Sequence, residues 1–309
     1  MNFFKPKFWD KNQVSLFSIL LFPISLWVNF FSFFKSLIGK KYTFSIPIVC
    51  VGNIYLGGTG KTPFCIELFS ILKKLNRNPA FIRKKYKSFQ DEVLLLEQTG
   101  ETYVGNSRIN ALNKAIKDKV DVAILDDGFQ DFSLKKDLSI VCFNESQWIG
   151  NGFVIPSGPL RERLSALSRA NLVVVNGRKN VNIENKILEN NKLIKIFYTK
   201  FKPENIDEFK NKKAICFAGI GNPDNFYNLL KENNVDIVKK INFPDHYTYS
   251  EEELDDLVKM AKEHNVILIT TEKDYFRINN KYAKNIKYLK ITTEIQNQEQ
   301  FIEEIKKFI

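Results

Sequence analysis

One stretch near the start of the chain decides the fold. Residues 45–53 read SIPIVCVGN, and residues 54–63 continue with IYLGGTGKTP. The first run is apolar and rich in β-branched residues, which predicts a buried strand, and FCIELFSILKKL over 64–75 has helical spacing. Between them lies a glycine-rich turn followed by Lys61 and Thr62. A strand, such a turn, Lys-Thr and a helix in this order are typical of the P-loop, which binds nucleotide phosphates.

The residue types of this turn suit a phosphate ligand. Glycines let backbone N–H groups curl around phosphate oxygens, and the helix N-terminus adds the positive end of its dipole. We expect Lys61 to reach the β- and γ-phosphates of ATP and the Thr62 hydroxyl to bind Mg²⁺. The candidate ATP-binding residues are Gly57, Gly58, Thr59, Gly60, Lys61 and Thr62. The usual pattern also has a glycine five positions before Gly60, where this chain has Tyr55.

A second motif fits the first. Residues 120–125, VDVAIL, predict an apolar strand, and Asp126-Asp127-Gly128 follows it directly. Carboxylates at the carboxyl end of a strand downstream of a P-loop are typical of the Walker B motif, which holds Mg²⁺. Asp126 and Asp127 are therefore candidate metal ligands together with Thr62. The alternative is an ordinary turn, which the P-loop upstream disfavours.

Composition limits the classes of protein and of partner. Of the 309 residues, 44% are hydrophobic and 26% charged, which excludes a disordered chain and a polytopic membrane protein. The 46 Lys and Arg outnumber the 35 Asp and Glu, so we expect an anionic partner: nucleic acid, an acidic membrane surface or phosphorylated small molecules. Nucleic acid is disfavoured because the chain has no basic-aromatic motif. The four cysteines form no CxxC pair, which disfavours a zinc site and a disulfide framework.

The first 40 residues are expected to form a membrane anchor. Residues 12–34 are mostly apolar and carry no charge, and lysines lie on both sides. One stripe of small polar residues recurs at helical spacing: Ser15, Ser18, Ser25, Asn29 and Ser32. Such a stripe packs on protein in a membrane span and faces the headgroups in an interfacial helix, so both placements stay open. A cleaved signal peptide and a buried core helix are less favoured alternatives.

A second, smaller α/β domain is expected in the last third. Residues 213–218 predict a strand, followed by GIGNP over 219–223 and a helix. That loop lacks the third glycine of a dinucleotide fingerprint and is a weak cofactor signal. We therefore predict an α/β fold with a P-loop NTPase-like domain over 41–205 and a smaller α/β domain over 206–309.

The chain has only two histidines, His246 and His264. His246 lies in the loop FPDHYTY over 243–249 beside a carboxylate, which favours a functional role. His264 falls at the end of a predicted helix, where a solvated histidine is the ordinary interpretation.

The order of these motifs resembles that of the tetraacyldisaccharide 4'-kinases, the lipid A 4'-kinases of Gram-negative bacteria. The matching stretches are VGNIYLGGTGKTP (51–63), Asp-Glu before an apolar run (91–96), ILDDGFQ (124–130), GNGFVIPSGPLRE (150–162), FAGIGNPDNF (217–226), FPDHYTY (243–249) and TTEKD (270–274). The resemblance implies an enzyme that uses ATP and Mg²⁺ to phosphorylate the 4'-hydroxyl of a tetraacylated glucosamine disaccharide 1-phosphate. It also implies a place at the cytoplasmic face of the inner membrane, with that lipid A precursor and membrane lipids as partners. The sequence indicates no protein partner.

The resemblance implies roles for single residues as well. Asp91 and His246 match a catalytic pair that deprotonates the acceptor hydroxyl, and Glu92 is expected near the metal. Arg161 follows a Gly-Pro loop and is expected to stabilise phosphoryl charge. Two further active-site candidates are Gln130 and Glu162.

The chain departs from the family's pattern at three places. Where the family has Ser-Arg-Gly-Tyr-Gly-Gly, this chain has IRKKYK over 82–87, so lysines replace glycines. Gln90 replaces the glycine before Asp-Glu, and Asp131 replaces the histidine after Gly-Phe-Gln. These departures affect the loop near Asp91 and any role of that histidine, but no residue expected to be catalytic.

The runner-up function is a membrane-associated P-loop ATPase that acts as a switch or targeting module. Its KGGxGKT motif needs a lysine where this chain has Leu56, which argues against it. A GTPase is disfavoured because the lysine of TEKD over 271–274 comes one place too late for a base-reading motif.

Overall fold

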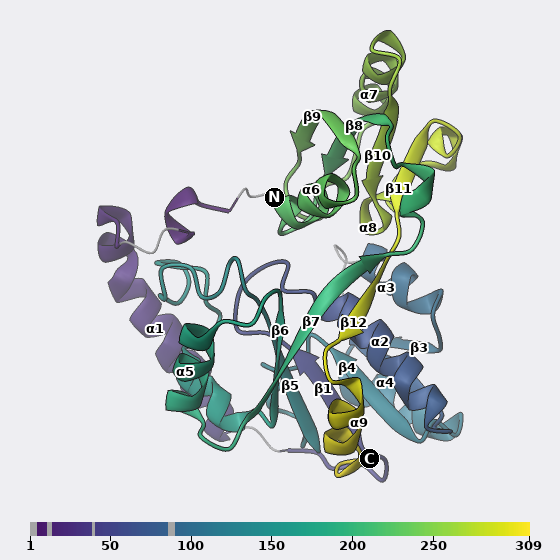
Figure 1. Cartoon of the computed structure of the whole chain (residues 1–309). Helices are drawn as coiled ribbons and strands as arrows, with labels where there is room; N and C mark the ends of the chain where they lie inside the picture. Colours follow the sequence, from purple (N-terminus) through teal and green to yellow (C-terminus); the bar gives the residue numbers. More distant parts are fainter. Residues whose placement is uncertain (1–4, 11–13, 39–40, 86–89) are drawn as a thin grey trace. The chain divides into compact units, whose positions relative to one another are not determined.

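The computed structural model describes residues 5–10, 14–38, 41–85 and 90–309. Two compact units, each built around one sheet, make up the chain (Figure 1). Within the described residues, the smaller unit comprises 90–98 and 201–293, and the larger unit comprises the remainder. The structure groups residues 294–309 with the larger unit, whereas the sequence placed them in the smaller domain. The domain limits at 40 and 205 stay predictions.

The larger sheet has eight strands in the order β12-β7-β6-β5-β1-β4-β2-β3. Their bounds are β1 (Ile48–Gly52), β2 (Pro79–Lys84), β3 (Thr102–Gly105), β4 (Val122–Asp126), β5 (Leu138–Asn144), β6 (Leu172–Asn176), β7 (Lys195–Pro203) and β12 (Ile291–Ile295). From β7 to β3, all neighbouring strands pair in parallel. Every residue of β1 and β4 is buried, which explains why both read as continuous apolar runs.

The strand order places the two nucleotide motifs side by side. β1 and β4 are neighbours, and Val51 pairs with Asp126 in the register. The carboxyl ends of parallel strands meet at one edge of a sheet, so the acidic end of β4 emerges beside the loop that follows β1. The predicted P-loop NTPase-like α/β fold is confirmed.

The helices of the larger unit are η1 (Lys7–Trp9), α1 (Leu16–Ile38), α2 (Lys61–Lys74), α4 (Arg108–Lys117), η2 (Leu164–Arg169), α5 (Val181–Asn190) and α9 (Gln298–Lys306). In α2, apolar residues recur at helical spacing and are buried: Phe64, Cys65, Leu68, Phe69, Ile71 and Leu72. The helix ends where Leu75 N donates back to Ile71 O at 3.1 Å and Asn76 turns to a φ of 58°. In α9, the buried ring of Phe301 packs edge-on against Phe64 and Phe197, which ties the C-terminus to the larger unit.

The smaller unit has a four-stranded sheet in the order β11-β10-β8-β9, with every neighbouring pair parallel. The strand bounds are β8 (Lys213–Ala218), β9 (Asp236–Asn242), β10 (Ile267–Thr271) and β11 (Ile286–Leu289). Its helices are α3 (Gln90–Glu97), η3 (Ile206–Glu208), α6 (Pro223–Glu232), α7 (Glu251–Glu263), α8 (Glu272–Tyr275) and η4 (Asn280–Tyr282). β8 has the bounds that the sequence predicts. Apolar clusters cover both faces of the sheet, so the unit has a core of its own.

The N-terminal helix α1 turns its small polar residues towards the protein. Ser25 Oγ donates to the carbonyl of Val154 at 2.8 Å, and Asn151 Nδ2 donates to Ser18 Oγ at 3.1 Å. Both serines are buried. The part of the polar stripe formed by Ser18 and Ser25 is therefore a packing surface. Residues 1–4, 11–13, 39 and 40 of the predicted anchor lie outside the described residues.

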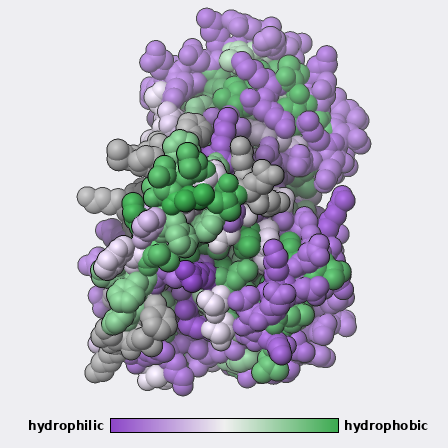
Figure 2. Space-filling view, turned by 90° about the vertical axis from the view of Figure 1, so that its left-hand side faces the viewer, coloured by the Kyte–Doolittle hydropathy of each residue, from purple (hydrophilic) through white to green (hydrophobic). Residues whose placement is uncertain are grey.

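Apolar side chains of α1 point outward instead. Eight of them are more than half exposed: Leu16, Phe17, Ile19, Leu20, Ile24, Trp27, Phe30 and Phe31. Figure 2 shows apolar surface gathered along this helix. Within the part of the chain that the structure describes, no helix combines the length and hydropathy needed to cross a bilayer.

Candidate active site

The loop between β1 and α2 has the backbone of a phosphate cradle. Gly57 and Gly60 adopt φ values of 121° and 85°, which favour glycine. Asn53 is buried, and its Nδ2 donates to the carbonyl of Gly57 at 3.3 Å and to Thr59 Oγ1 at 3.0 Å. Asn53 therefore holds the loop in shape. No sequence pattern indicates this role, because an amide before glycines is ordinary in any turn.

Tyr55, which replaces the usual first glycine, holds the loop in place by packing its side chain into the protein. Its side chain is fully buried against Val154 and Leu160, and its hydroxyl donates to Asp10 Oδ1 at 3.0 Å. Burial, reinforced by Asp10, raises the pKa of the Tyr55 phenol above its usual value. The tyrosine is therefore a packing residue with a neutral hydroxyl, and the flexibility of a glycine is not needed here.

Asp126 and Thr62 lie together at the edge of the larger sheet. Thr62 Oγ1 donates to Asp126 Oδ2 at 3.4 Å, and Arg83 Nη1 lies 3.1 Å from the same oxygen. Asp126 is 1% exposed and Arg83 is 4% exposed, so this ion pair is sealed from water. Sequence reasoning missed Arg83, because its partner lies 43 positions away and only the fold joins them. Tyr86 and Lys87, from the same departing stretch, lie outside the described residues.

One carboxylate oxygen of Asp127 lies close to two cationic side chains. Its Oδ1 is 2.7 Å from Arg161 Nη1 and 3.7 Å from Lys61 Nζ. Asp127 has a φ of 56°, a left-handed conformation that costs free energy for a non-glycine residue. The structure thus joins three residues that the sequence singled out separately.

A buried arginine, Arg108, braces that left-handed turn. Its Nη2 donates to the carbonyl oxygens of Asp126 at 3.3 Å and Asp127 at 2.8 Å. Its Nη1 pairs with Asp131 Oδ2 at 3.1 Å. Although burial acts to raise it, the pKa of Asp131 lies below its usual value, because Ser133 and Arg108 stabilise the carboxylate. The aspartate that departs from the family's histidine is therefore an ionised partner of Arg108.

The two remaining candidates of the larger unit form one chain of hydrogen bonds. Gln130 Nε2 donates to the carbonyl of Asn53 at 2.9 Å and to Glu162 Oε1 at 3.0 Å. Glu162 is buried, and its other oxygen accepts from Arg169 at 2.6 Å. Gln130 thus ties the start of the phosphate loop to the loop that carries Arg161.

The donor set of Thr62, Asp126 and Asp127 fits Mg²⁺. These are hard oxygen ligands, and Mg²⁺ binds through one or two carboxylates completed by water and substrate phosphates. The described residues hold no metal-binding group made of three or more His, Cys, Asp or Glu residues. Glu92, the fourth residue expected near the metal, belongs to the smaller unit, where Lys273 Nζ lies 2.9 Å from its Oε1.

In the smaller unit, Asp91 and His246 form a contact although they lie far apart in the sequence. His246 Nδ1 is 3.2 Å from Asp91 Oδ1, and Arg277 Nε is 3.3 Å from the other oxygen. Burial acts to raise the pKa of Asp91, but the hydrogen bond from His246 and the charges of Lys273 and Arg277 hold it below its usual value. An ionised Asp91 places the proton of a neutral His246 on Nδ1 and leaves Nε2 as the basic nitrogen.

Three motifs meet around the loop that carries His246. His246 has a φ of 57°, and its backbone N donates to Gly219 O at 3.1 Å. Arg277 donates to Gly219 O at 3.1 Å and to Tyr247 O at 3.0 Å. The fully buried Asp274 accepts from Gly219 N at 3.1 Å. The glycine loop after β8 therefore serves to support His246, and the sequence could not reveal Arg277. His264, by contrast, is an exposed residue at the end of α7.

Comparison with known proteins identifies the family. A family model described as tetraacyldisaccharide-1-P 4'-kinase matches residues 17–309. The chain belongs to this family. Among relatives named tetraacyldisaccharide 4'-kinase, that of Pelagibacter ubique is 44% identical, covering 95% of this chain and 94% of its own. That of Rickettsia akari is 34% identical, covering 98% and 96%.

A solved structure supports the fold of the kinase family for this chain. The crystal structure of LpxK from Aquifex aeolicus, in complex with ATP, superposes with a TM-score of 0.73 at 23% sequence identity. The match covers 95% of this chain and 100% of that one. The resemblance stated from the motifs is confirmed, while the roles of single residues stay predictions.

Proposed function

We propose that the chain transfers the γ-phosphoryl group of ATP to the 4'-hydroxyl of a tetraacylated glucosamine disaccharide 1-phosphate. Family membership supports the reaction, and the 3.2 Å contact between Asp91 and His246 carries the choice of a kinase over a switch. A sugar hydroxyl is a poor nucleophile until a base takes its proton. A nucleotide switch has no acceptor alcohol and needs no such pair.

The larger unit supplies the groups for the nucleotide. Residues 57–62 would bind the phosphates through backbone N–H groups, and Lys61 and Arg161 would offset the charge of the transferred group. The side chains of Lys61 and Arg161 both approach Asp127 Oδ1, which supports this role, because two cations this close together form a site for an anion. When bound, Mg²⁺ would be held by Thr62, Asp126 and Asp127 and would neutralise phosphate charge.

The smaller unit supplies the groups for the acceptor. His246 Nε2 takes the proton of the 4'-hydroxyl as its oxygen bonds to the γ-phosphorus. The bond from that phosphorus to the β–γ bridging oxygen breaks, and its electron pair leaves with ADP. Asp91 stabilises the imidazolium that forms and keeps the ring oriented.

An ADP-release assay in detergent micelles tests the reaction. With Mg-ATP, ADP formation should depend on a tetraacyl disaccharide 1-phosphate that has a free 4'-hydroxyl. The matched control is the same lipid already phosphorylated at that position, which should not stimulate ADP release. Equal ATP hydrolysis with and without the acceptor would favour the switch or targeting ATPase instead.

We also propose that α1 lies in the interface of the inner membrane, on its cytoplasmic face. The exposed apolar side chains of α1 support this, because water-exposed Phe, Leu and Trp side chains gain free energy when acyl chains cover them. The net charge of +11 adds attraction to anionic lipids.

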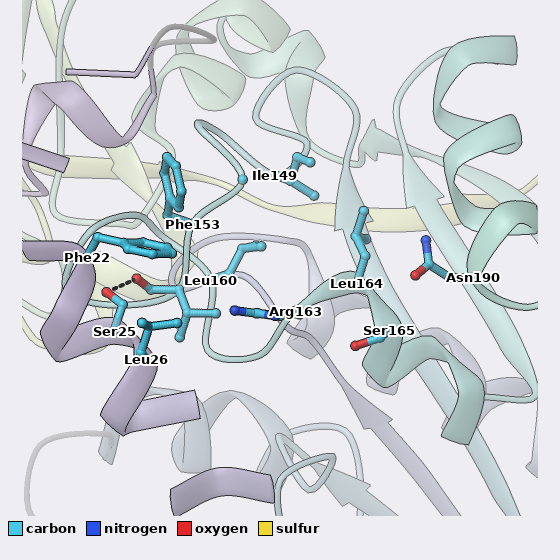
Figure 3. Close-up of a pocket in the computed structure, with 12 residues that line it drawn as sticks. Phe22, Ser25, Leu26, Ile149, Phe153, Leu160, Arg163, Leu164, Ser165 and Asn190 are labelled. Carbon is cyan, nitrogen blue, oxygen red and sulfur yellow. Dashed lines mark hydrogen bonds between the residues drawn. The ribbon is translucent and has the colours of Figure 1, made fainter. Parts of the chain in front are cut away.

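A cavity beside α1 supports a lipid acceptor. It has a volume of about 610 Å³ and lies between α1 and residues 149–165 (Figure 3). Phe22, Leu26, Phe153 and Leu164 give it apolar walls, and Arg163 contributes a cation. Apolar walls with one cationic group suit an acyl chain that carries an anionic headgroup.

Vesicle sedimentation tests the membrane contact. Trp27→Glu and Phe31→Glu, which change side chains 64% and 66% exposed, should release the protein from vesicles of anionic and zwitterionic phospholipid. The control is Leu193→Glu, an even more exposed apolar residue of the same unit outside α1. Undiminished binding of both α1 variants would place the membrane contact elsewhere.

A further inference from the structure

Lys273 lies among the groups of the proposed base. Its Nζ is 2.9 Å from Glu92 Oε1 and 3.2 Å from His246 Nε2. Asp91 Oδ2 and Asp245 Oδ1 lie farther away, at 3.8 Å and 4.0 Å. The proton on Nδ1 leaves Nε2 as an acceptor, so the ammonium donates to the same nitrogen that would receive the substrate's proton.

Lys273 sits on a rigid support. It is the second residue of α8, and the backbone of the next residue, Asp274, donates to Thr271 Oγ1 at 3.1 Å at the start of that helix. Asp274 is fully buried and accepts from Tyr249 and from Gly219. No role was assigned to the TTEKD motif from the sequence alone. Its contacts hold the backbone of Lys273 in a fixed position.

Exposure separates the groups that can touch a substrate from those that cannot. The side chain of Asp91 is 1% exposed, whereas those of His246 and Lys273 are 13% and 21% exposed. An acceptor oxygen can lie within hydrogen-bond reach of both His246 Nε2 and Lys273 Nζ, because the two nitrogens are only 3.2 Å apart. A hydroxyl at that shared position contacts the base and the ammonium together.

We propose that Lys273 is a catalytic residue that donates a hydrogen bond to the acceptor oxygen while His246 removes its proton. The proposal rests on the kinase function proposed above. As the oxygen loses its proton to His246 Nε2 and bonds to phosphorus, negative charge develops on it, and a fixed ammonium stabilises that charge.

The charge state of Lys273 suits this role. Burial acts to lower its pKa, but the carboxylates of Glu92, Asp245 and Asp91 outweigh burial and raise the pKa above its usual value. The side chain is therefore an ammonium at neutral pH. It neither gains nor loses a proton in the step, so the proton balance stays with His246.

The alternative is that Lys273 only neutralises Glu92, and a double-mutant cycle separates the two roles. Lys273→Met should lower kcat by about 10²–10³-fold, the usual effect of removing one such donor. Lys273→Arg should keep more of the rate because it retains a cationic donor. The affinity for ATP should not change. Lys281→Met, at an exposed lysine that pairs with Glu251 in the same unit, should keep the wild-type rate.

The decisive comparison is Lys273→Met in a Glu92→Gln background. A loss of at least tenfold relative to Glu92→Gln alone is expected if the ammonium contacts the acceptor. No further loss there, or a wild-type kcat in Lys273→Met itself, would overturn the proposal while leaving the kinase function intact.

Thermal melts identify variants that do not fold. If both Met variants fail to fold and Lys273→Arg keeps wild-type kcat, the lysine is structural and the proposal also fails. A wild-type chain without transfer activity would instead remove the proposed function.

Discussion

Removal of the imidazole of His246 is the perturbation with the most defined consequence. His246→Ala deletes the imidazole that contacts Asp91, at 3.2 Å from Nδ1 to Oδ1. General-base assistance is worth about 10²–10⁴-fold, or roughly 3–5 kcal/mol of transition-state stabilisation. We therefore expect kcat to fall by that factor while the affinity for ATP stays unchanged.

Asp91 should behave as the other half of the same unit. Asp91→Asn keeps the shape but removes the charge that orients and stabilises His246, so kcat should fall by a similar factor. It also removes the buried negative charge that lies 3.3 Å from Arg277 and 3.8 Å from Lys273, and we expect a lower melting temperature as well. The double variant should lose much less than the product of the single losses, since Asp91 acts through His246.

Steady-state phosphotransfer kinetics and thermal melts on the same preparations measure both effects. His264→Ala is the matched control, because this exposed histidine ends α7 and touches neither Asp91 nor His246 in the described structure. A kcat within tenfold of wild type for His246→Ala, together with a lower melting temperature, would show that the histidine only supports its loop. Fully multiplicative losses would refute the idea of one catalytic unit.

Three further predictions follow from single contacts. Lys61→Ala should lower kcat/KM more than tenfold without changing the melting temperature, because its ammonium faces Asp127 at 3.7 Å and serves phosphate binding; kinetics and a thermal melt check this. Arg108→Lys should lower the free energy of unfolding by about 2–4 kcal/mol in denaturant titrations, since a lysine cannot bridge the two carbonyls and the carboxylate. Burial raises the pKa of Glu272 to about 7 in the folded chain. Above the usual pKa of a glutamate, the unfolded chain therefore ionises this residue more easily than the folded chain does. The resulting loss of folding stability grows as the pH rises to about 7 and then stays constant. Glu272→Gln should therefore stabilise the chain by up to about 3 kcal/mol at pH 8 and hardly at pH 4.5, as melts at both pH values would show.

Local patterns made much of the fold predictable. The strand before Gly57, the helix after Lys61 and the strand before Asp126 each follow from short runs of sequence, and all three are present. The helical spacing also revealed the polar stripe on α1. It could not show which way the stripe faces, because that depends on partners such as Val154, more than a hundred positions away.

The site was predictable only where a motif carries its own chemistry. The cations Arg83, Arg108 and Arg277 gave no signal, because an arginine in a mixed sequence is ordinary until the fold gives it a carboxylate partner. Lys273 lay inside a recognised motif, yet its contact with Glu92 spans 181 positions and exists only in the folded unit. Tyr55 broke a pattern at a position where packing replaces the flexibility of glycine.

The position of the transferred phosphate tests the account most directly. Purified protein, ATP labelled at the γ-phosphate and a tetraacyl disaccharide 1-phosphate are incubated in micelles with Mg²⁺, and the lipid product is analysed by mass spectrometry and phosphorus NMR. We predict one new phosphate per acceptor, on the 4'-oxygen, with the label recovered in the lipid and at least 100-fold less product, or about 1% or less, from the His246→Ala protein in the same time. Label released as inorganic phosphate despite the acceptor, or attached at another hydroxyl, would contradict the account.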